Sequence, residues 1–171
     1  DTAVVKRAYG EDYFMRTFSY YYLVRLFGGV PLRTKATDIT SDFYLPRSSV
    51  DSVYQQVFAD FKRASSMLPP ASAISADELG RATKGAAQAM LSEAYLTYGD
   101  QLSLKGQDAT REFQSAELYA DSVITSGEYA LLDNYADLWN VQQETQAYKE
   151  VIFSIRFQTD PVEEFDFWID D

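Results

Sequence analysis

The fold is decided by residues 13–32, YFMRTFSYYYLVRLFGGVPL. Apolar and aromatic side chains recur there at spacings of three and four residues, the periodicity of a helix that lays one face on a core. Other apolar residues extend this surface nearly around the helix axis, so partners are expected on more than one side. The stretch is therefore predicted to be the central element of a helical array. The apolar residues are Phe14, Phe18, Tyr20, Tyr21, Tyr22, Leu23, Val24, Leu26 and Phe27.

The end of this helix is marked by a glycine pair and a proline. Gly28 and Gly29 can both take the left-handed conformation that closes a helix. Pro31 forces the preceding residue into an extended shape, so a sharp turn is expected. The helix is predicted over residues 1–27, as one helix or as two abutting at Gly10.

Ion pairing and capping add detail to the first two helices. Asp12 and Arg16 have the spacing of a helical ion pair. A second amphipathic helix is predicted to begin at Ser48, with Asp51 reaching back as in a capping box, and to end before Pro69.

Two further helices follow a polar linker. The third is predicted to be capped by Thr83 and closed by Gly99. Small side chains at residues 85–87, beginning with Gly85, would let a neighbouring helix approach closely. The fourth is predicted to begin near Thr110 and to stop at Gly127.

The last patterned stretch, residues 151–157, alternates apolar and polar side chains and is predicted to be a half-buried β-strand. The sequence shows no partner strand, and a lone strand leaves its backbone groups unpaired. We therefore expect one mostly α-helical domain over residues 1–171, with a core over 3–157, a short C-terminal β-strand and an acidic tail over 158–171. The unpaired strand indicates that the chain is either incomplete or has a partner.

Composition excludes several classes of function. The 171 residues carry a net charge of −11 and contain neither cysteine nor histidine, which removes disulfides, thiol chemistry and the commonest metal ligand. The negative net charge argues against binding of nucleic acid or anionic lipid. No apolar run is long enough to span a bilayer. No signal peptide opens the chain, which leaves a cytosolic protein or a removed start as alternatives.

Reactive chemistry is not predicted. The spacing of Gly80 and Gly85 is that of a phosphate loop, but the Lys-Ser/Thr pair that such a loop needs after its second glycine is missing. A carboxylate pair for glycoside hydrolysis is conceivable among 26 acidic residues, most of which are expected on the surface. No catalytic residue, cofactor or metal is therefore predicted. The acidic residues that could hold Ca²⁺ are better explained as a solvated tail: Glu163, Glu164, Asp166, Asp170 and Asp171.

Aromatic rings are the remaining class of side chains that could bind a ligand. The chain has 13 Tyr, 11 Phe and 2 Trp, most of which fit the helical core. Sugars present C–H faces that can stack on rings, and Tyr and Trp add a polar handle. Four rings outside the helical stripes are the candidate ligand contacts: Tyr44, Tyr135, Trp139 and Trp168.

Six phrases in order resemble one family. They are FGGVPL (27–32), PRSSVDSVY (46–54), LP (68–69), GRATKGAA (80–87), SGEYAL (126–131) and EVIFSIRF (150–157). Together they resemble the SusD/RagB family of outer-membrane nutrient-binding lipoproteins of Bacteroidetes. No single phrase is specific, whereas the ordered set across residues 13–157 is. By their physics these phrases are architectural, and the residues singled out are Gly28, Gly29, Pro31, Gly80, Arg81, Thr83 and Gly85.

The resemblance implies a core of tetratricopeptide-like helical pairs, in an α-α superhelix. It also implies a surface-exposed protein held in the outer membrane by an N-terminal lipid anchor that is absent from this chain, and a SusC-like TonB-dependent transporter as partner. The ligand would be a glycan or a peptide, and this chain would be the central portion of a longer protein. A helical-repeat scaffold that grips a protein partner is the alternative that the helical pairs alone support, and a glycosidase is a third.

Overall fold

The computed structural model of the protein describes residues 2–38 and 42–155. These residues are mostly helical, as predicted, and they contain no β-strand. Four long helices form the body: α1 (Thr2–Phe27), α2 (Val50–Met67), α3 (Lys84–Leu104) and α4 (Thr110–Ile124). Five shorter elements connect or follow them: η1 (Ala71–Ala73), η2 (Ala76–Glu78), η3 (Tyr135–Trp139), η4 (Val141–Gln143) and α5 (Glu144–Ala147).

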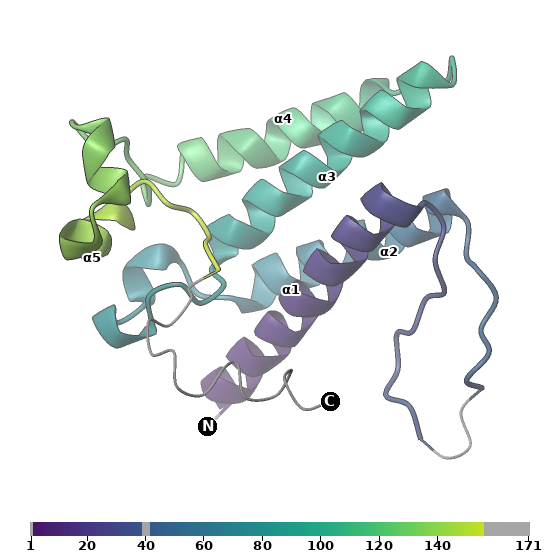
Figure 1. Ribbon diagram of the computed structural model, residues 1–171, viewed down its shortest axis with the longest axis horizontal. Coiled ribbons are helices and arrows are strands. Elements are labelled where there is room, and N and C mark those ends of the chain that lie inside the picture. The colour runs from purple at the N-terminus through teal and green to yellow at the C-terminus, as the bar shows by residue number, and fades with distance from the viewer. Residues whose placement is uncertain (1, 39–41, 156–171) are drawn as a thin grey trace, which may run out of the picture.

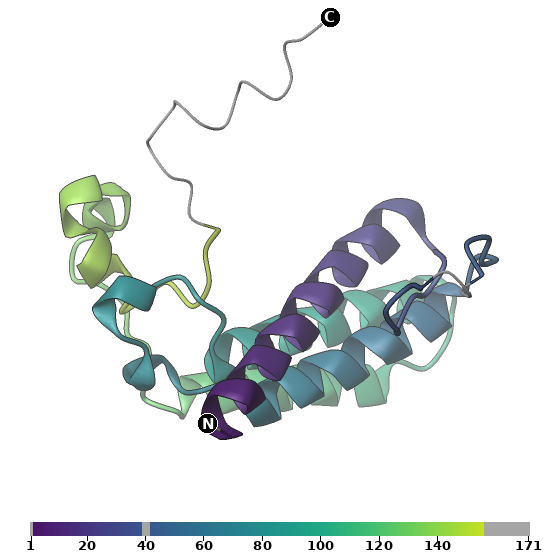
Figure 2. The same cartoon turned by 90° about the horizontal axis from the view of Figure 1, so that it is seen from below.

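The long helices form two antiparallel pairs, α1 with α2 and α3 with α4, and the pairs meet where α2 packs on α3 (Figure 1). This is the stacked helical-pair arrangement that was predicted. Helix α1 is not its centre, however. It packs on α2 and only marginally touches α3, so the inner positions belong to α2 and α3 (Figure 2).

The core lies between these helices and is rich in aromatic rings. Phe58 and Tyr95 stack face to face across α2 and α3 with ring centroids 3.9 Å apart. Phe14 of α1 meets Phe61 of α2 edge-on at 5.8 Å. Such ring pairs add about 0.5–1.5 kcal/mol each beyond the burial of their area. Large side chains without solvent contact are Phe14, Tyr21, Tyr54, Phe61 and Leu91.

Helix α1 is continuous, and its last turn is uncovered. Gly10 does not break it. That glycine is buried against α2, where an added Cβ would lie 3.0 Å from the Met67 Cβ atom. Besides α2, Phe153 packs on α1 at Phe14 and Phe18, whereas the last turn of α1 stays open, with Leu26 72% and Phe27 60% exposed.

The predicted helix ends are partly right. Gly28 takes the left-handed conformation with φ of +69°, and Gly80, Gly106 and Gly127 also have positive φ, whereas Gly29 does not. The cap of α2 is Ser49, one residue later than predicted, and its hydroxyl accepts a hydrogen bond from the Ser52 amide at 3.1 Å.

Helix α3 begins as predicted but runs further. The Thr83 hydroxyl accepts a hydrogen bond from the Ala86 amide at 3.0 Å, which confirms the cap. Gly99 does not end the helix, which continues to Leu104. It lies inside the α3–α4 contact, where an added Cβ would be 2.8 Å from the Phe113 ring. The signal at Gly99 was therefore one of close helix packing.

The predicted strand is not formed by residues 151–155, and residues 156 and 157 lie outside the described range. Phe153 explains the difference, because its ring packs edge-on against Phe14 and Phe18 at 4.9 and 5.6 Å. The alternating apolar side chains thus reach a helical surface instead of a sheet.

The predicted Asp12–Arg16 ion pair is replaced by a longer-range one. Arg16 reaches across to Asp60 of α2, donating from Nε to the carboxylate at 2.8 Å, and also to the Thr34 carbonyl at 2.9 Å. This arginine joins α1, α2 and the loop between them. None of the helices in the described ranges is both long and apolar enough to cross a bilayer.

Candidate functional site

The phrase GRATKG (80–85) forms the junction between the two helical pairs. Gly80, with φ of +94°, turns the chain out of η2. Arg81 donates to Glu11 of α1 at 2.9 Å and to Glu78 of η2 at 2.9 Å. Arg7 of α1 bonds the same two carboxylates at 3.2 and 3.0 Å. The four charges tie the linker before α3 onto the start of α1.

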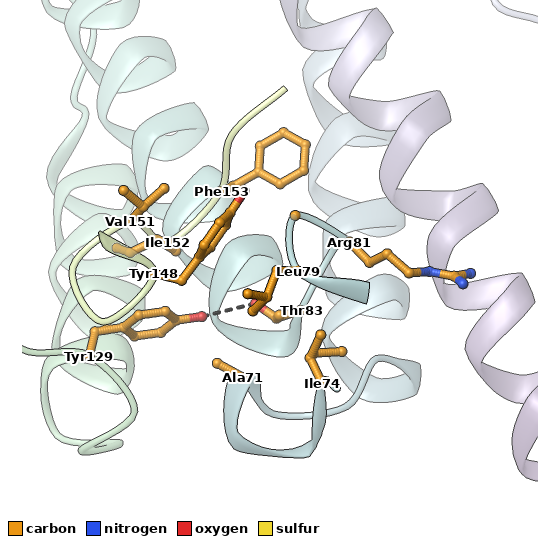
Figure 3. Close-up of a pocket in the computed structure, with 11 residues that line it drawn as sticks. Ala71, Ile74, Leu79, Arg81, Thr83, Tyr129, Tyr148, Val151, Ile152 and Phe153 are labelled. Carbon is orange, nitrogen blue, oxygen red and sulfur yellow. Dashed lines mark hydrogen bonds between the residues drawn. The ribbon is translucent and has the colours of Figure 1, made fainter. Parts of the chain in front are cut away.

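The second half of this phrase, residues 83–85, contacts the segment that follows α4. The hydroxyl groups of Thr83 and Tyr129 are hydrogen-bonded at 2.9 Å (Figure 3). The Tyr129 ring also covers Gly85, where an added Cβ would lie 2.5 Å from the ring. Gly85 was predicted to admit a neighbouring helix, but it is this ring that approaches it. Burial raises the pKa of Tyr129 above its ordinary value, so its phenol stays protonated and able to donate.

The junction encloses a cavity of about 50 Å³. Ligand sites for small molecules have volumes of roughly 300–1,000 Å³, so this cavity is a packing gap. Figure 3 shows the side chains around it, which come from the α2–α3 linker and from the segment after α4. The lining residues are Ala71, Ile74, Leu79, Gly80, Arg81, Thr83, Tyr129, Tyr148, Val151, Ile152 and Phe153.

Two hydrogen bonds join the two ends of the segment that follows this junction and contains the short helix η3. The Ala130 amide donates to the Lys149 carbonyl at 2.8 Å, and the Leu132 amide donates to the Glu150 carboxylate at 2.8 Å. They close residues 130–150 into a compact loop that contains η3. The junction therefore determines where η3 stands relative to the helical body.

Tyr135 and Trp139 lie together at the two ends of η3. Their ring centroids are 6.4 Å apart and their planes meet at 69°, an edge-to-face arrangement. Both rings remain open to solvent, Tyr135 at 71% and Trp139 at 74% exposure. The two rings, four residues apart in sequence, thus form a ring pair on the surface. Exposed rings of this kind suit contact with an apolar face of a ligand.

The other two candidate rings are not part of this pair. Tyr44 is 93% exposed and lies beside Phe43 in the loop between α1 and α2, at the opposite end of the molecule (Figure 1). Trp168 lies outside the described residues. The structure therefore brings together two of the four predicted contacts.

Three residues beside the ring pair were not predicted. Asn134 caps η3 by accepting a hydrogen bond from the Ala136 amide at 3.2 Å, and Asn140 follows its end. Leu131 is 84% exposed on the approach to η3. The spacing of Asn134 and Asp137, a side chain that can cap a helix followed three residues later by an acid, was the available signal.

Metal binding has no candidate in the described ranges 2–38 and 42–155, where no three acidic side chains lie together in a way that could hold an ion. The acidic cluster that was weighed for Ca²⁺, residues 163–171, lies outside those ranges.

Removing the Tyr129 hydroxyl tests the junction. Tyr129→Phe is expected to lower the free energy of unfolding by about 1 kcal/mol, because the partly buried Thr83–Tyr129 bond is lost. Urea unfolding followed by circular dichroism measures this. Tyr44→Phe, at an exposed ring, is the matched control and is expected to change nothing; equal stabilities for both variants would contradict the assignment.

Comparison with known proteins agrees with this fold. Residues 1–96 match the model of a SusD-like family described as starch-binding and associating with the outer membrane. The chain is 30% identical over 163 residues to SusD-like protein P2 of Formosa agariphila, covering 92% of this chain and 28% of that protein. A crystal structure of a SusD-like protein from Bacteroides fragilis superposes with a TM-score of 0.77 at 28% identity, over 94% of this chain and 29% of that one.

A structure described as a laminarin-binding SusD-like protein gives a TM-score of 0.72 at 28% identity, over 90% of this chain and 31% of that one. In each of these comparisons the chain spans less than a third of the length of its relative.

Proposed function

The chain belongs to the SusD-like family, and from this premise we propose that it is the helical part of a non-enzymatic glycan-binding protein in which Tyr135 and Trp139 stack on sugar rings. The family description, starch-binding and associating with the outer membrane, supports the ligand class and the compartment. The observation that carries the proposal is the exposed ring pair on η3.

The geometry of the pair suits a sugar. A pyranose presents axial C–H groups on its faces, and these pack on an aromatic face by dispersion and by attraction to the ring's negative quadrupole. Two rings at 69° offer two differently directed surfaces, so they can contact consecutive sugar units that are not coplanar. Asn134 already bonds Ala136 and Asp137 through its side-chain oxygen and nitrogen, and the Asn140 Oδ1 atom accepts from the Gln142 amide at 3.0 Å. The Asn140 side-chain nitrogen, at the end of η3, is therefore the group that would donate to a sugar hydroxyl.

The wider arrangement is part of the same proposal. The protein would be surface-exposed, held at the outer membrane by an N-terminal lipid anchor, and would pass its glycan to a SusC-like TonB-dependent transporter. The support is the family description together with the resemblance of the six phrases. A related SusD-like protein is described as laminarin-binding, which makes this β-glucan a suitable first ligand beside starch.

Substitution of the rings tests the site. In the full-length protein, Trp139→Ala is expected to weaken glycan binding about tenfold, since loss of a ring that stacks on the ligand removes on the order of 1–1.5 kcal/mol. Isothermal titration calorimetry with laminarin and with soluble starch oligosaccharides measures the dissociation constants. No release of reducing sugar is expected in the same samples.

The matched control is Tyr44→Ala, which removes another exposed ring, at the other end of the molecule. Its affinity is expected to equal that of the unchanged protein. A loss with Tyr44→Ala and none with Trp139→Ala would move the site to the α1–α2 loop. Unchanged dissociation constants in both variants would show that neither ring contacts the ligand.

A further inference from the structure

Two acidic residues stand next to the ring pair. Asp133 and Asp137 are each two residues away from a ring residue, and Asp137 lies between Tyr135 and Trp139 within η3. Since consecutive Cα atoms are about 3.8 Å apart, the Cα atom of each acid lies within about 8 Å of the Cα atom of a ring residue. A charged group on a ligand that stacks on either ring therefore comes close to a carboxylate.

No cation in the described ranges neutralises these two acids. Asp133 is exposed, and within residues 2–38 and 42–155 its carboxylate forms no ion pair. Asp137 accepts a hydrogen bond from a neutral group, the Asn134 side-chain amide, at 3.2 Å. The arginines of the junction, Arg7 and Arg81, are already held by the carboxylates of α1 and η2. Both aspartates therefore present their charge to a ligand on the rings.

The segment that carries η3 adds further negative charge. Besides the two aspartates, residues 130–150 contain Glu144 and Glu150, and their single cation is Lys149. Helix α5, which packs on η3, includes Glu144 and no basic residue. Lys149 stands at the base of the segment, where its carbonyl accepts a hydrogen bond from the Ala130 amide. The electrostatic potential around the rings is therefore expected to be negative.

The neutral polar side chains of this segment are mostly amides. Asn140, Gln142 and Gln146 are exposed and lie between the end of η3 and the end of α5. An amide both donates and accepts hydrogen bonds, as a sugar hydroxyl does, and it carries no charge that would attract an ion. These side chains suit hydroxyl groups better than carboxylates or sulfates.

We propose that the ring pair selects neutral glycans over acidic ones, with Asp133 and Asp137 as the specificity-determining residues. This inference rests on the proposed function and adds the charge of the ligand that the site takes. The two carboxylates act at a distance, since they are within about one Debye length of the ring residues, roughly 8 Å at physiological ionic strength. They repel a uronate or a sulfated sugar and leave the stacking of a neutral sugar unaffected.

Matched oligosaccharides test this selection. In the full-length protein, isothermal titration calorimetry measures the dissociation constants of neutral laminarin oligosaccharides and of the same oligosaccharides oxidised to carboxylates at C6. The neutral form is expected to bind at least about tenfold more tightly, because an ionised sugar on the rings meets both aspartates. Raising the salt concentration from about 0.02 M to about 0.5 M is expected to narrow this difference, since salt screens exposed charges. Equal affinity for both forms at low salt overturns the proposal.

A double variant removes the two charges and keeps the shape of the side chains. In Asp133→Asn with Asp137→Asn, the new amide at position 137 retains an oxygen that can accept the hydrogen bond from Asn134. This variant is expected to bind the oxidised oligosaccharides about tenfold more tightly than the unchanged protein does, and to bind the neutral ones within about twofold of it. A preference for the neutral form that stays as large as before overturns the proposal.

The matched control removes two carboxylates at the far end of the molecule. Asp100→Asn with Glu112→Gln changes the last turns of α3 and the first turn of α4, which meet on the side opposite α5 (Figure 1). The two double variants have the same net charge, and the control is expected to keep the preference of the unchanged protein. An equal gain in both would assign the effect to the overall charge of −11 and overturn the local selection.

Trp139→Ala distinguishes failure of this inference from failure of the proposed function. If that variant loses neutral oligosaccharide while the unchanged protein binds both forms equally, the ring site stands and its selection by charge is wrong. If that variant binds neutral oligosaccharide as tightly as the unchanged protein, or if no neutral oligosaccharide binds at all, both conclusions are wrong.

Discussion

Asp60→Ala is expected to destabilise the protein by about 3 kcal/mol and to lower its melting temperature by roughly 10 °C. The Asp60 side chain has no solvent contact and is held by two arginines. Arg16 of α1 donates to one carboxylate oxygen at 2.8 Å, and Arg63 donates to the other at 3.1 Å. Removal of the carboxylate leaves both guanidinium groups without their shared anion.

The magnitude follows from where the three charges lie. A buried pair that loses one partner costs about 3–5 kcal/mol. The lower end applies here because Arg16 is 27% and Arg63 53% exposed, so water can solvate them in part. The effect extends to the α1–α2 loop, because Arg16 also donates to the Thr34 carbonyl.

Thermal unfolding by circular dichroism measures this change. Asp100→Ala removes an exposed carboxylate on α3 and is the matched control, with an expected change under about 0.5 kcal/mol. If Asp60→Ala and Asp100→Ala have the same melting temperature, the buried carboxylate does not stabilise the contact between α1 and α2.

Gly29→Ala is expected to cost more than about 3 kcal/mol, although Gly29 has no left-handed backbone. An added Cβ would overlap the Ser48 carbonyl oxygen, a clash that only backbone movement can relieve. That movement would break the Ser48–Val30 backbone hydrogen bond of 3.1 Å, which closes the base of the α1–α2 loop.

Gly28→Ala separates the two roles of the glycine pair. Gly28 has φ of +69°, but its added Cβ would meet only Val50 at an ordinary 3.8 Å. Strain alone is therefore expected, at about 1–2 kcal/mol. Urea unfolding of both variants measures the difference, and a Gly29→Ala variant no less stable than Gly28→Ala would show that the loop base can shift without loss.

The expected stability effects and the proposed binding site lie in different parts of the chain. Asp60 and Gly29 hold α1, α2 and their loop together, whereas the ring pair of η3 stands beyond the junction made by Thr83 and Tyr129. Substitutions at Trp139 are thus expected to affect ligand binding and to leave unfolding almost unchanged.

The sequence by itself determined the helical class, the helix starts to within one residue and the left-handed turn at Gly28, since periodicity, caps and glycine act over one or two turns. It also marked Tyr135 and Trp139, four residues apart, as rings outside the helical core. These features depend on local backbone geometry, which neighbouring residues fix.

Only the tertiary structure decided which partner each residue meets. Arg16 was four residues from Asp12 and yet pairs with Asp60, because a buried carboxylate needs a cation more than an exposed one does. Gly85 was predicted to admit a helix and Gly99 to end one, whereas each accommodates a ring from another segment. Residues 151–155 alternate like a strand, but Phe153 packs on Phe14 and Phe18 of α1 instead. Contacts between residues far apart in sequence decided these cases, and such contacts exist only once the helices have packed.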